Sequence, residues 1–525
     1  MCVCRKLLLF SLLFFSLFSS LQTEAQSRYW VVFKEKPVSE QPQLVSAHTQ
    51  QNRQKLDLPL FHFSDAPVSS AYLDSLKSLT IKIKTVSKWL NAAAVEATAH
   101  QISLLQRLTF VQEVHPINGY LTASSTSAPA SFKPAYVSKA INQIKPQALF
   151  EAGLTGKGVK IGVIDAGFYG APQKAGLAPI FESGRETAFR DYVNPDQQHP
   201  YTVRESNLDY HGTDVLLLIG GYDPTLNLLT GLAPEATYYL ARTDHGKREN
   251  RMEEENFIKA LEWMDSLGVR LVNSSLGYAT GYDDPKENYR PDQMDGSSMI
   301  ARAVQTAIEE KGMTIILSAG NDGAKQSWQI IGTPADAPGT IAVGSSDFKT
   351  WTKQGYSGVG PAFLPYLKPD LVCFSANGTS FSAPIITGLA ACLLQFKPEL
   401  TNEELTNILR QSGHLYPYGN NFVGYGVPNA QQALWLAQDS LAATVSMPLK
   451  PLLVTGSKLK YKAAANRAAM QYNGGIVLFR KRSPTQVIRQ EKRSTRARRI
   501  KLKRLPNETH TTLQIGPEVV ELVWQ

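Results

Sequence analysis

The sequence predicts an α/β fold in which a mostly parallel sheet carries helices on both faces. Continuous apolar runs, typical of buried parallel strands, occupy residues 159–164, 269–272 and 314–317. Residues 253–267 and 298–311 repeat apolar side chains at helical spacing, and each run stops at a glycine. Strands and helices that alternate in this order build a parallel sheet, whose ligands bind beyond the carboxyl ends of the strands.

Length and composition allow several globular domains. The 525 residues are 43% hydrophobic and 9% aromatic, with 30 prolines and 37 glycines, which excludes a disordered, collagen-like or coiled-coil chain. The formal net charge is +9, but residues 441–525 hold 17 Lys and Arg against 4 Asp and Glu. The basic character therefore belongs to the tail, and residues 1–440 carry a small acidic surplus.

The first residues have the pattern of a cleaved export signal. Two basic residues precede an apolar run over residues 7–21, and the following Thr-Glu-Ala predicts cleavage after Ala25. The alternative is a membrane anchor, but about 15 apolar residues fall short of the roughly 20 that span a bilayer. No cysteine follows the run for lipid attachment. We expect residues 1–25 to be a signal peptide and the mature protein to be soluble and secreted.

The cysteine content excludes a fold that is held together by disulfide bonds. Cys2 and Cys4 belong to the predicted signal peptide, whereas Cys373 and Cys392 have apolar neighbours. Buried, inert thiols are favoured over a disulfide or a nucleophile. The longest later apolar segment, residues 383–396, contains a proline and a glycine and is predicted to be a core helix rather than a membrane span.

Residues 26–120 predict a small α+β unit ahead of the main domain. Its expected elements are strands at 29–33 and 111–115, a strand region at 81–97 and helices at 70–79 and 100–108. Residues 121–134 are rich in Ser, Thr, Ala and Pro without apolar periodicity, which is typical of an exposed, cleavable linker. The main α/β domain is expected at 135–440 and a basic domain at 441–525.

Two polar residues stand where a predicted element ends or begins. Asp165 follows the strand at 159–164, which places a carboxylate at the carboxyl edge of the sheet. His211 opens a helical run and has a glycine beside it, so a substrate could approach the imidazole. Taken singly, Asp165 could equally be a helix cap or turn former, and His211 a surface or capping residue.

A hydroxyl and an amide occupy similar positions later in the chain. Ser380 lies in Gly378-Thr379-Ser380, directly before the apolar helix, where the helix dipole favours developing negative charge. Asn321 follows the strand at 314–317 and supplies a side-chain amide at the same edge of the sheet. An ordinary Ser/Thr cap and an Asn turn are the alternative interpretations.

These four positions, with the acid, imidazole and hydroxyl in the order Asp, His, Ser, resemble the subtilase family of serine peptidases. The resemblance covers roughly residues 131–440 and implies a subtilisin-like parallel sheet with helices on both faces. The unit at 26–120 resembles the inhibitory propeptide of the family, although its first helix comes late, after a Gln-rich insertion. A small β-rich domain is expected to follow at 441–525.

The resemblance implies a role for each of these residues. Ser380 is the nucleophile, His211 is the general base and later the general acid, and Asp165 orients and stabilises the imidazolium. A serine hydroxyl needs such a base because it is a poor nucleophile near neutral pH. Asn321 and the backbone amide of Ser380 are expected to stabilise the oxyanion.

The substrate-binding residues are also carried over from the family. Ser275, Leu276 and Gly277 match the strand edge to which an extended peptide adds. Ser318, Ala319 and Gly320 match the wall of the primary specificity pocket. Gly332 matches its base, which leaves room for a large apolar side chain; a surface-loop glycine is the alternative interpretation there.

Two features depart from the family pattern. Asp214 stands where many members have a second histidine, and it is not expected to join the proton relay. Residues 278–298 form an acidic insertion, which contains Asp283, Asp284, Glu287, Asp292 and Asp295. A structural calcium ion is possible there, but no calcium-loop spacing is present, so a solvated acidic loop is favoured and no cofactor is expected.

The sequence does not decide the role of the basic tail, residues 441–525. Its strands, expected at 449–454, 476–479 and 519–524, alternate with Lys and Arg clusters. The cations could bind polyanions, or they could form a solvated face, which is favoured. Nucleic acid is not expected as a partner, and a sorting role has no recognisable motif.

The sequence therefore predicts a secreted serine endopeptidase that is made as a zymogen. Its expected partners are a protein or peptide substrate and its own propeptide, which acts as inhibitor. Two alternatives are kept open: a peptide ligase with the same fold, and a catalytically silent module that binds polyanions.

Overall fold

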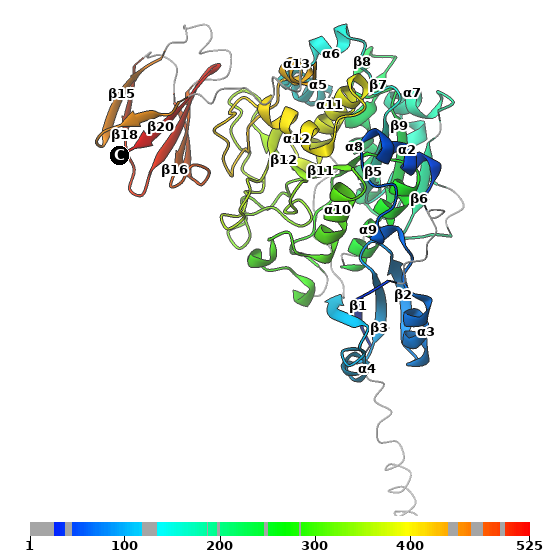
Figure 1. The fold of residues 1–525 in the computed structure, drawn as a ribbon. Helices are drawn as coiled ribbons and strands as arrows, with labels where there is room; N and C mark the ends of the chain where they lie inside the picture. Colours follow the sequence, from blue (N-terminus) through cyan, green and yellow to red (C-terminus); the bar gives the residue numbers. More distant parts are fainter. Residues whose placement is uncertain are drawn as a thin grey trace, which may run out of the picture.

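The computed structural model describes residues 26–36, 45–117, 134–185, 187–196, 200–245, 250–282, 285–438, 450–463, 476–493 and 499–525. The predicted signal peptide, and the predicted linker apart from Pro134, lie outside these residues. Figure 1 shows an N-terminal unit (residues 26–117), a central domain (134–438) and a C-terminal domain (450–525) on another side of the central domain.

The central domain is built on a seven-stranded sheet. Its strands, in the spatial order β13-β12-β11-β10-β5-β9-β6, are β13 (Leu371–Phe374), β12 (Ile341–Ser346), β11 (Thr314–Ser318), β10 (Leu271–Ser274), β5 (Lys160–Asp165), β9 (Thr237–Arg242) and β6 (Ala188–Asp191). All six neighbouring pairs are parallel. Most strand residues are buried because helices cover both faces, as the continuous apolar runs predicted.

Two hydrophobic cores sandwich this sheet. Helices α9 (Met252–Ser266) and α10 (Met299–Glu309) bury Leu261 and Val304 against one face. The larger core on the other face includes α8 (His211–Gly220) and the buried helix α11 (Ala383–Phe396). The remaining helices of the domain are α5 (Pro134–Gln143), α6 (Gln147–Glu151), α7 (Ala178–Phe181), α12 (Asn402–Gln411) and α13 (Ala430–Gln438), and the short strands β7 (Tyr222–Asp223) and β8 (Leu228–Leu229) pair with each other.

Helix α11 explains the apolar segment near the C-terminal end of this domain. Within the described residues, the segment Thr379–Phe396 is long and apolar enough to cross a membrane, but 83% of it is buried inside the protein. It is therefore the expected core helix. Cys392 within this helix and Cys373 of β13 are free and buried, as expected, and burial raises the pKa of each thiol to about 12.

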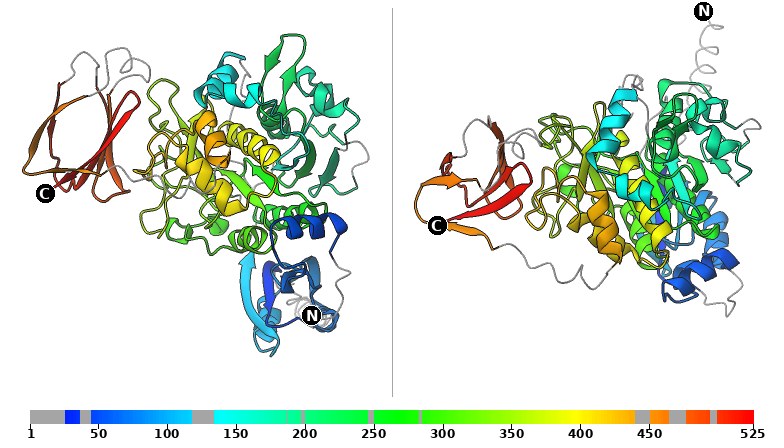
Figure 2. Two further views of the ribbon diagram at one scale, coloured as in Figure 1. Left: turned by 45° about the horizontal axis from the view of Figure 1, so that its top comes forward. Right: turned by 90° about the horizontal axis from the view of Figure 1, so that it is seen from above.

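The N-terminal unit is a four-stranded antiparallel sheet in the order β2-β3-β1-β4. Its strands are β1 (Ser27–Phe33), β2 (Lys82–Ser87), β3 (Ala92–Ala97) and β4 (Val111–Ile117), and its helices are α2 (Ala47–Lys55), α3 (Ser70–Ser78) and α4 (Ala99–Leu105). The expectation that the first helix begins at residue 70 is wrong. The polar insertion itself forms α2, which lies against the central domain, away from α3 (Figure 2).

The C-terminal domain is made of β-strands, as expected. A five-stranded sheet has the order β14-β20-β19-β16-β17, and a separate ribbon pairs β15 with β18. The bounds are β14 (Leu452–Val454), β15 (Lys458–Lys462), β16 (Ile476–Lys481), β17 (Val487–Arg493), β18 (Arg499–Lys503), β19 (His510–Ile515) and β20 (Glu518–Trp524). Asn421 and Lys353 of the central domain bond this domain at Val487 and Gln490.

Candidate active site

A cleft of about 600 Å³ lies at the carboxyl ends of β5 and β10. From β5 the chain continues to β6 and β9 on one side of the sheet, whereas β10 to β13 lie on the other side. Such a reversal of strand order opens a crevice at the carboxyl edge. His211, Asn321 and Ser380 line the cleft, and Asp165 lies behind His211. The structure thus brings together all four predicted catalytic positions.

Asp165 and His211 form a buried acid–imidazole pair. Asp165 is the last residue of β5 and His211 the first of α8, and His211 Nδ1 lies 2.7 Å from Asp165 Oδ1. The close approach depends on Gly212, because a Cβ there would lie 2.5 Å from the carbonyl oxygen of Gly167. Asp165 Oδ1 also accepts a hydrogen bond from the backbone of Ala166, at 2.8 Å. The carboxylate therefore has a fixed orientation toward the ring.

The protonation of His211 follows from this pairing. Burial of the imidazole lowers the pKa of His211, but the charge and hydrogen bond of Asp165, together with the charges of Asp214 and Asp244, outweigh burial and raise the pKa above its ordinary value. A neutral ring that donates from Nδ1 to Asp165 leaves the Nε2 lone pair free to accept a proton. The arrangement suits a general base that becomes a stabilised imidazolium.

Ser380 lies beside this pair, in the short turn Thr379–Phe381 that leads into α11. Its hydroxyl donates to the backbone oxygen of Ser275 at 3.2 Å, and the Ser275 hydroxyl donates to the backbone oxygen of Ser380 at 2.9 Å. The next residue, Phe381, has its ring centroid 5.5 Å from that of His211. The serine and the imidazole thus line the same cleft, and a rotation about χ1 of Ser380 would redirect its hydroxyl.

Asn321 supplies an oriented amide to the same cleft. Its Oδ1 accepts hydrogen bonds from the backbone and hydroxyl of Thr379, at 2.9 and 3.1 Å. Both partners bind the oxygen, which leaves Nδ2 as a donor. Gly378 has φ of 138°, and a Cβ there would lie 3.4 Å from Asn321 Nδ2. A glycine at this position therefore keeps the space before the donor open.

The predicted substrate-binding residues also lie at this cleft. Its lining includes Ser275, Leu276, Gly277, Ser318, Gly320 and Gly332. Ala319 is the exception, since it is fully buried beneath the surface. Tyr278 and Thr333 exchange backbone hydrogen bonds of 2.8 and 2.9 Å, which joins the predicted strand edge to the loop that carries Gly332. Gly332 is therefore not a remote surface glycine.

Sequence analysis missed Asp244 as a residue of the cleft. It follows β9 by two residues and accepts a hydrogen bond from the Tyr278 hydroxyl at 3.1 Å. Its position just past the end of β9 is the sequence signal that could have identified it as a residue of the cleft. Asp214 lies on α8 with its pKa raised to about 6 by burial, and its charge helps to raise the pKa of His211.

The acidic insertion provides no metal site in the part of the chain that the structure describes. No group of three or more His, Cys, Asp or Glu side chains there could hold a metal ion. Asp283 and Asp284 lie outside the described residues. The expectation of a solvated loop is wrong for Glu287, which is 1% exposed and accepts a hydrogen bond from the backbone of Arg251. Among the described residues, this insertion therefore offers a calcium ion no cluster of carboxylates.

The N-terminal unit packs against helices α9 and α10, which cover one face of the central sheet. Trp30, Val32 and Leu90 pack against Ile258 of α9 and Met299 of α10 in one buried cluster. Figure 1 shows the unit on the side of the central domain that carries these helices. The contact buries apolar surface that would otherwise face water, which is the main stabilising force for such an interface.

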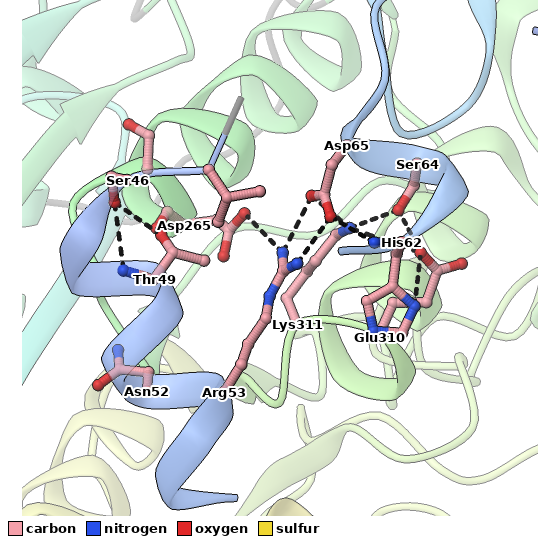
Figure 3. Close-up of polar contacts among 12 residues, drawn as sticks. Ser46, Thr49, Asn52, Arg53, His62, Ser64, Asp65, Asp265, Glu310 and Lys311 are labelled. Atoms are coloured by element: carbon pink, nitrogen blue, oxygen red, sulfur yellow. Dashed lines mark hydrogen bonds and ion pairs between the residues drawn. The ribbon is translucent and has the colours of Figure 1, made fainter. Parts of the chain in front are cut away.

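The polar insertion of this unit adds a buried ionic contact (Figure 3). Arg53 of α2 is completely buried and binds Asp65 through two hydrogen bonds of 2.6 and 2.9 Å. Lys311 of the central domain donates to Asp65 at 2.9 Å, and Asp265 of α9 lies 3.7 Å from Arg53. Two cations and two carboxylates thus alternate across the interface. We call these four residues the ionic cluster.

Comparison with known proteins agrees with the geometry. The Subtilase family matches residues 156–426, just over half of the chain, and the Bacteroidota Peptidase S8 propeptide domain matches residues 28–131. Subtilisin NAT of Bacillus subtilis subsp. natto is 27% identical over 367 residues, which is 67% of this chain and 83% of the relative. A subtilisin of Bacillus pumilus is 28% identical over 304 residues, 56% of this chain and 97% of the relative.

Solved structures show the same fold. The epidermin leader peptide processing serine protease of Staphylococcus aureus has a TM-score of 0.53 at 16% identity, and the match covers 79% of this chain and 99% of that one. Fervidolysin of Fervidobacterium pennivorans, a keratinolytic enzyme related to subtilisin, has a TM-score of 0.51 at 16% identity, with 94% and 72% covered. The chain belongs to the subtilase family and is a subtilisin-like serine peptidase with a propeptide domain.

Proposed function

We propose that this protein is a secreted serine endopeptidase, made as a zymogen, that cleaves proteins through an acyl-enzyme formed on Ser380. The observation that carries the proposal is the 2.7 Å contact between His211 and Asp165 at the cleft that Ser380 lines. An oriented base beside a hydroxyl, with amide donors opposite, is the arrangement that acyl transfer requires.

In the proposed mechanism His211 Nε2 takes the proton of Ser380 as Oγ attacks the substrate carbonyl carbon. Asp165 stabilises the imidazolium that forms. The oxyanion accepts hydrogen bonds from Asn321 Nδ2 and the backbone amide of Ser380. His211 then protonates the leaving amine, and water, deprotonated by the same ring, hydrolyses the acyl-enzyme and regenerates Ser380.

The substrate is proposed to bind as an extended strand. Residues 275–277 follow β10 and line the cleft with open space at Gly277, where an added Cβ would meet nothing within 4 Å. Backbone pairing along such an edge recognises the main chain of a peptide and tolerates many sequences. Gly332 leaves the proposed specificity pocket open for a large apolar side chain.

The propeptide is proposed to act as a folding aid and inhibitor that remains attached until the linker at 121–134 is cut. Its apolar contact with α9 and α10 and the ionic cluster support its attachment to the folded central domain. Both interactions hold the N-terminal unit on the central domain without using any cleft residue. Secretion through the predicted signal peptide would place the mature enzyme outside the cell or in its envelope.

The experiment expresses the wild-type chain beside Ser380→Ala and determines the N-terminus of each product. The proposal predicts that the wild type begins within or just after the linker, whereas the variant keeps the propeptide covalently attached. Mixing a small amount of active wild type with the variant should then cut the variant at the same bond. Identical processing of both chains when each is expressed alone would contradict self-maturation.

A further inference from the structure

The ribbon of the C-terminal domain places six cations on one face. Strands β15 and β18 pair antiparallel, and each cation of one strand stands opposite a cation of the other. The pairs are Lys458 with Lys503, Lys460 with Lys501, and Lys462 with Arg499. All six side chains are exposed, whereas the residues between them point to the opposite, apolar face. We call these six residues the cationic face.

Among the described residues, the cationic face is the outermost layer on this side of the molecule. In β16, Val477 and Phe479 pack into the core of the central domain, whereas Leu478 belongs to a separate core. That second core also contains Ile500 and Leu502 of the ribbon. The five-stranded sheet therefore lies between the central domain and the ribbon. Both views in Figure 2 show the ribbon on the side away from the central domain.

The carboxylates of the C-terminal domain have their described partners outside the cationic face. Residues 441–525 contain four acids, Glu491, Glu508, Glu518 and Glu521. Their described partners are Arg480, Arg489 and Arg493 for Glu491, Arg480 for Glu508, Tyr461 for Glu518, and Lys481 for Glu521. Among the described ion pairs, none involves a cation of the cationic face. Like charges directly opposite each other destabilise a sheet, so folding alone does not account for this pattern.

We propose that the cationic face binds a linear anionic polysaccharide that carries sulfate or carboxylate groups. Alternate residues of a strand repeat at about 7 Å, and cross-strand pairs are about 5 Å apart. The face thus presents two rows of three charges, which suits a polymer with repeated anionic groups better than one small anion. Five of the six cations are lysines, whose compact charges accept anions without the fixed geometry that arginine imposes.

The surface is less suited to a nucleic acid. Proteins that bind single strands combine basic grooves with aromatic side chains on which bases stack. The one aromatic residue of the two strands, Tyr461, lies on the apolar face, where its hydroxyl donates to Glu518. The choice of a polysaccharide as the ligand also rests on the proposed secretion. The arrangement of the six charges does not depend on that proposal.

The test measures binding of the full-length chain in a Ser380→Ala background, so that all variants keep the same termini. The probes are heparin, polygalacturonate and a single-stranded DNA oligonucleotide, each at several salt concentrations. The test variant combines Lys460→Gln, Lys501→Gln and Lys503→Gln. The matched control removes the same charge elsewhere in the domain by Lys450→Gln, Arg482→Gln and Lys492→Gln, all at exposed positions.

The proposal predicts that the parent binds at least one polysaccharide, with an affinity that falls as salt rises. The test variant should lose at least about tenfold in affinity and show a shallower salt dependence, whereas the control should lose less than about twofold. Arginine at the same three positions should restore binding, which excludes misfolding as the cause. Heparin and polygalacturonate distinguish sulfate from carboxylate ligands.

Three results would overturn the proposal: no binding of the parent to either polysaccharide, equal losses in test variant and control, or tighter binding of the oligonucleotide than of both polysaccharides at the same salt. Because the proposal concerns binding alone, its failure would leave the peptidase mechanism untouched. Loss of Ser380 reactivity would conversely leave this proposal standing.

Discussion

Ser275 and Ser380 hold each other through two reciprocal hydrogen bonds, each hydroxyl donating to the other residue's backbone oxygen, at 2.9 and 3.2 Å. The end of β10, where the peptide substrate is proposed to pair, is thereby tied to the turn that carries the proposed nucleophile. The Ser380 hydroxyl therefore points toward a carbonyl oxygen in this structure. It must rotate toward His211 before attack, which a bound substrate can promote by occupying the strand edge.

Replacing Asn321 by Ala should lower kcat far more than it changes KM. The amide is proposed to donate to the oxyanion, which exists in the transition state and not in the bound substrate. Loss of one such donor costs about 10²- to 10³-fold in kcat. Steady-state hydrolysis of a peptide substrate measures both constants.

The matched control for Asn321 is Lys325→Ala, on the same loop at the cleft wall. It should leave kcat within about twofold, because it removes no donor to the oxyanion. Equal losses of kcat in the two variants would contradict the assigned role of Asn321.

Replacing Asp214 by Asn should shift the acidic limb of the kcat/KM profile to lower pH. Asp214 and Asp165 both raise the pKa of His211, against the effect of burial. Because the base must be neutral, activity falls as the pH drops through this pKa, which lies above the ordinary value of about 6.5. Removing the Asp214 charge should therefore move the midpoint to lower pH. A shift to higher pH would contradict the account.

Replacing Gly332 by Val should narrow the proposed specificity pocket. A Cβ at Gly332 would lie 2.9 Å from the carbonyl oxygen of Tyr278, so even a small side chain presses on the strand edge. The ratio of kcat/KM for a substrate with Phe before the cleaved bond to one with Ala there should fall by about tenfold or more. A uniform loss for both substrates would instead indicate general disruption of the cleft.

Replacing Asp65 by Ala should destabilise the uncut Ser380→Ala precursor by about 3–5 kcal/mol, because Arg53 and Lys311 would remain buried with less compensation. Denaturant unfolding measures the loss. Asp74→Ala is the control: its carboxylate is 67% exposed and pairs with Lys77, so the cost should stay below about 1 kcal/mol.

The loss of stability in Asp65→Ala should depend on pH in a definite direction. Burial raises the pKa of Asp65, but its hydrogen bonds to Arg53 and Lys311 outweigh burial and lower the pKa. A carboxylate with a lowered folded-state pKa stabilises the folded chain above its unfolded value of about 3.9 and loses that effect as pH falls. The difference between precursor and variant should therefore be constant from pH 5 to 8 and shrink below about pH 4.

Local sequence patterns predicted the central sheet and its catalytic edge because continuous apolar runs and helical spacing are short-range signals. Asp165 and His211 could be placed because they end and begin such elements, and Asn321 and Ser380 because each lies within three residues of one. Strand bounds differ by a residue or two. The strand expected at 269–272 is observed at Leu271–Ser274, because the polar Asn273 and Ser274 pair with both neighbouring strands although they end the apolar run.

Helix α2 was not predicted because its sequence has no apolar residues at helical spacing. Residues 48–55 are all polar, and the helix buries Thr49 and Arg53 instead of a hydrophobic stripe. Its partners Asp65, Asp265 and Lys311 are distant in sequence, so only the folded chain brings the four charges together. The alternation of Lys with apolar residues in β15 and β18 was visible, but their register was not.

The joint action of Asp165, His211 and Ser380 is tested most directly by labelling the mature enzyme with a fluorophosphonate, followed by peptide mapping and a measurement of the labelling rate against pH. If the three side chains act together, one residue, Ser380, should be modified, at a rate that falls as His211 becomes protonated and that drops by several orders of magnitude in His211→Ala. Modification of a different residue, or a rate on Ser380 unchanged by His211→Ala, would contradict the claim that Asp165, His211 and Ser380 act as one unit.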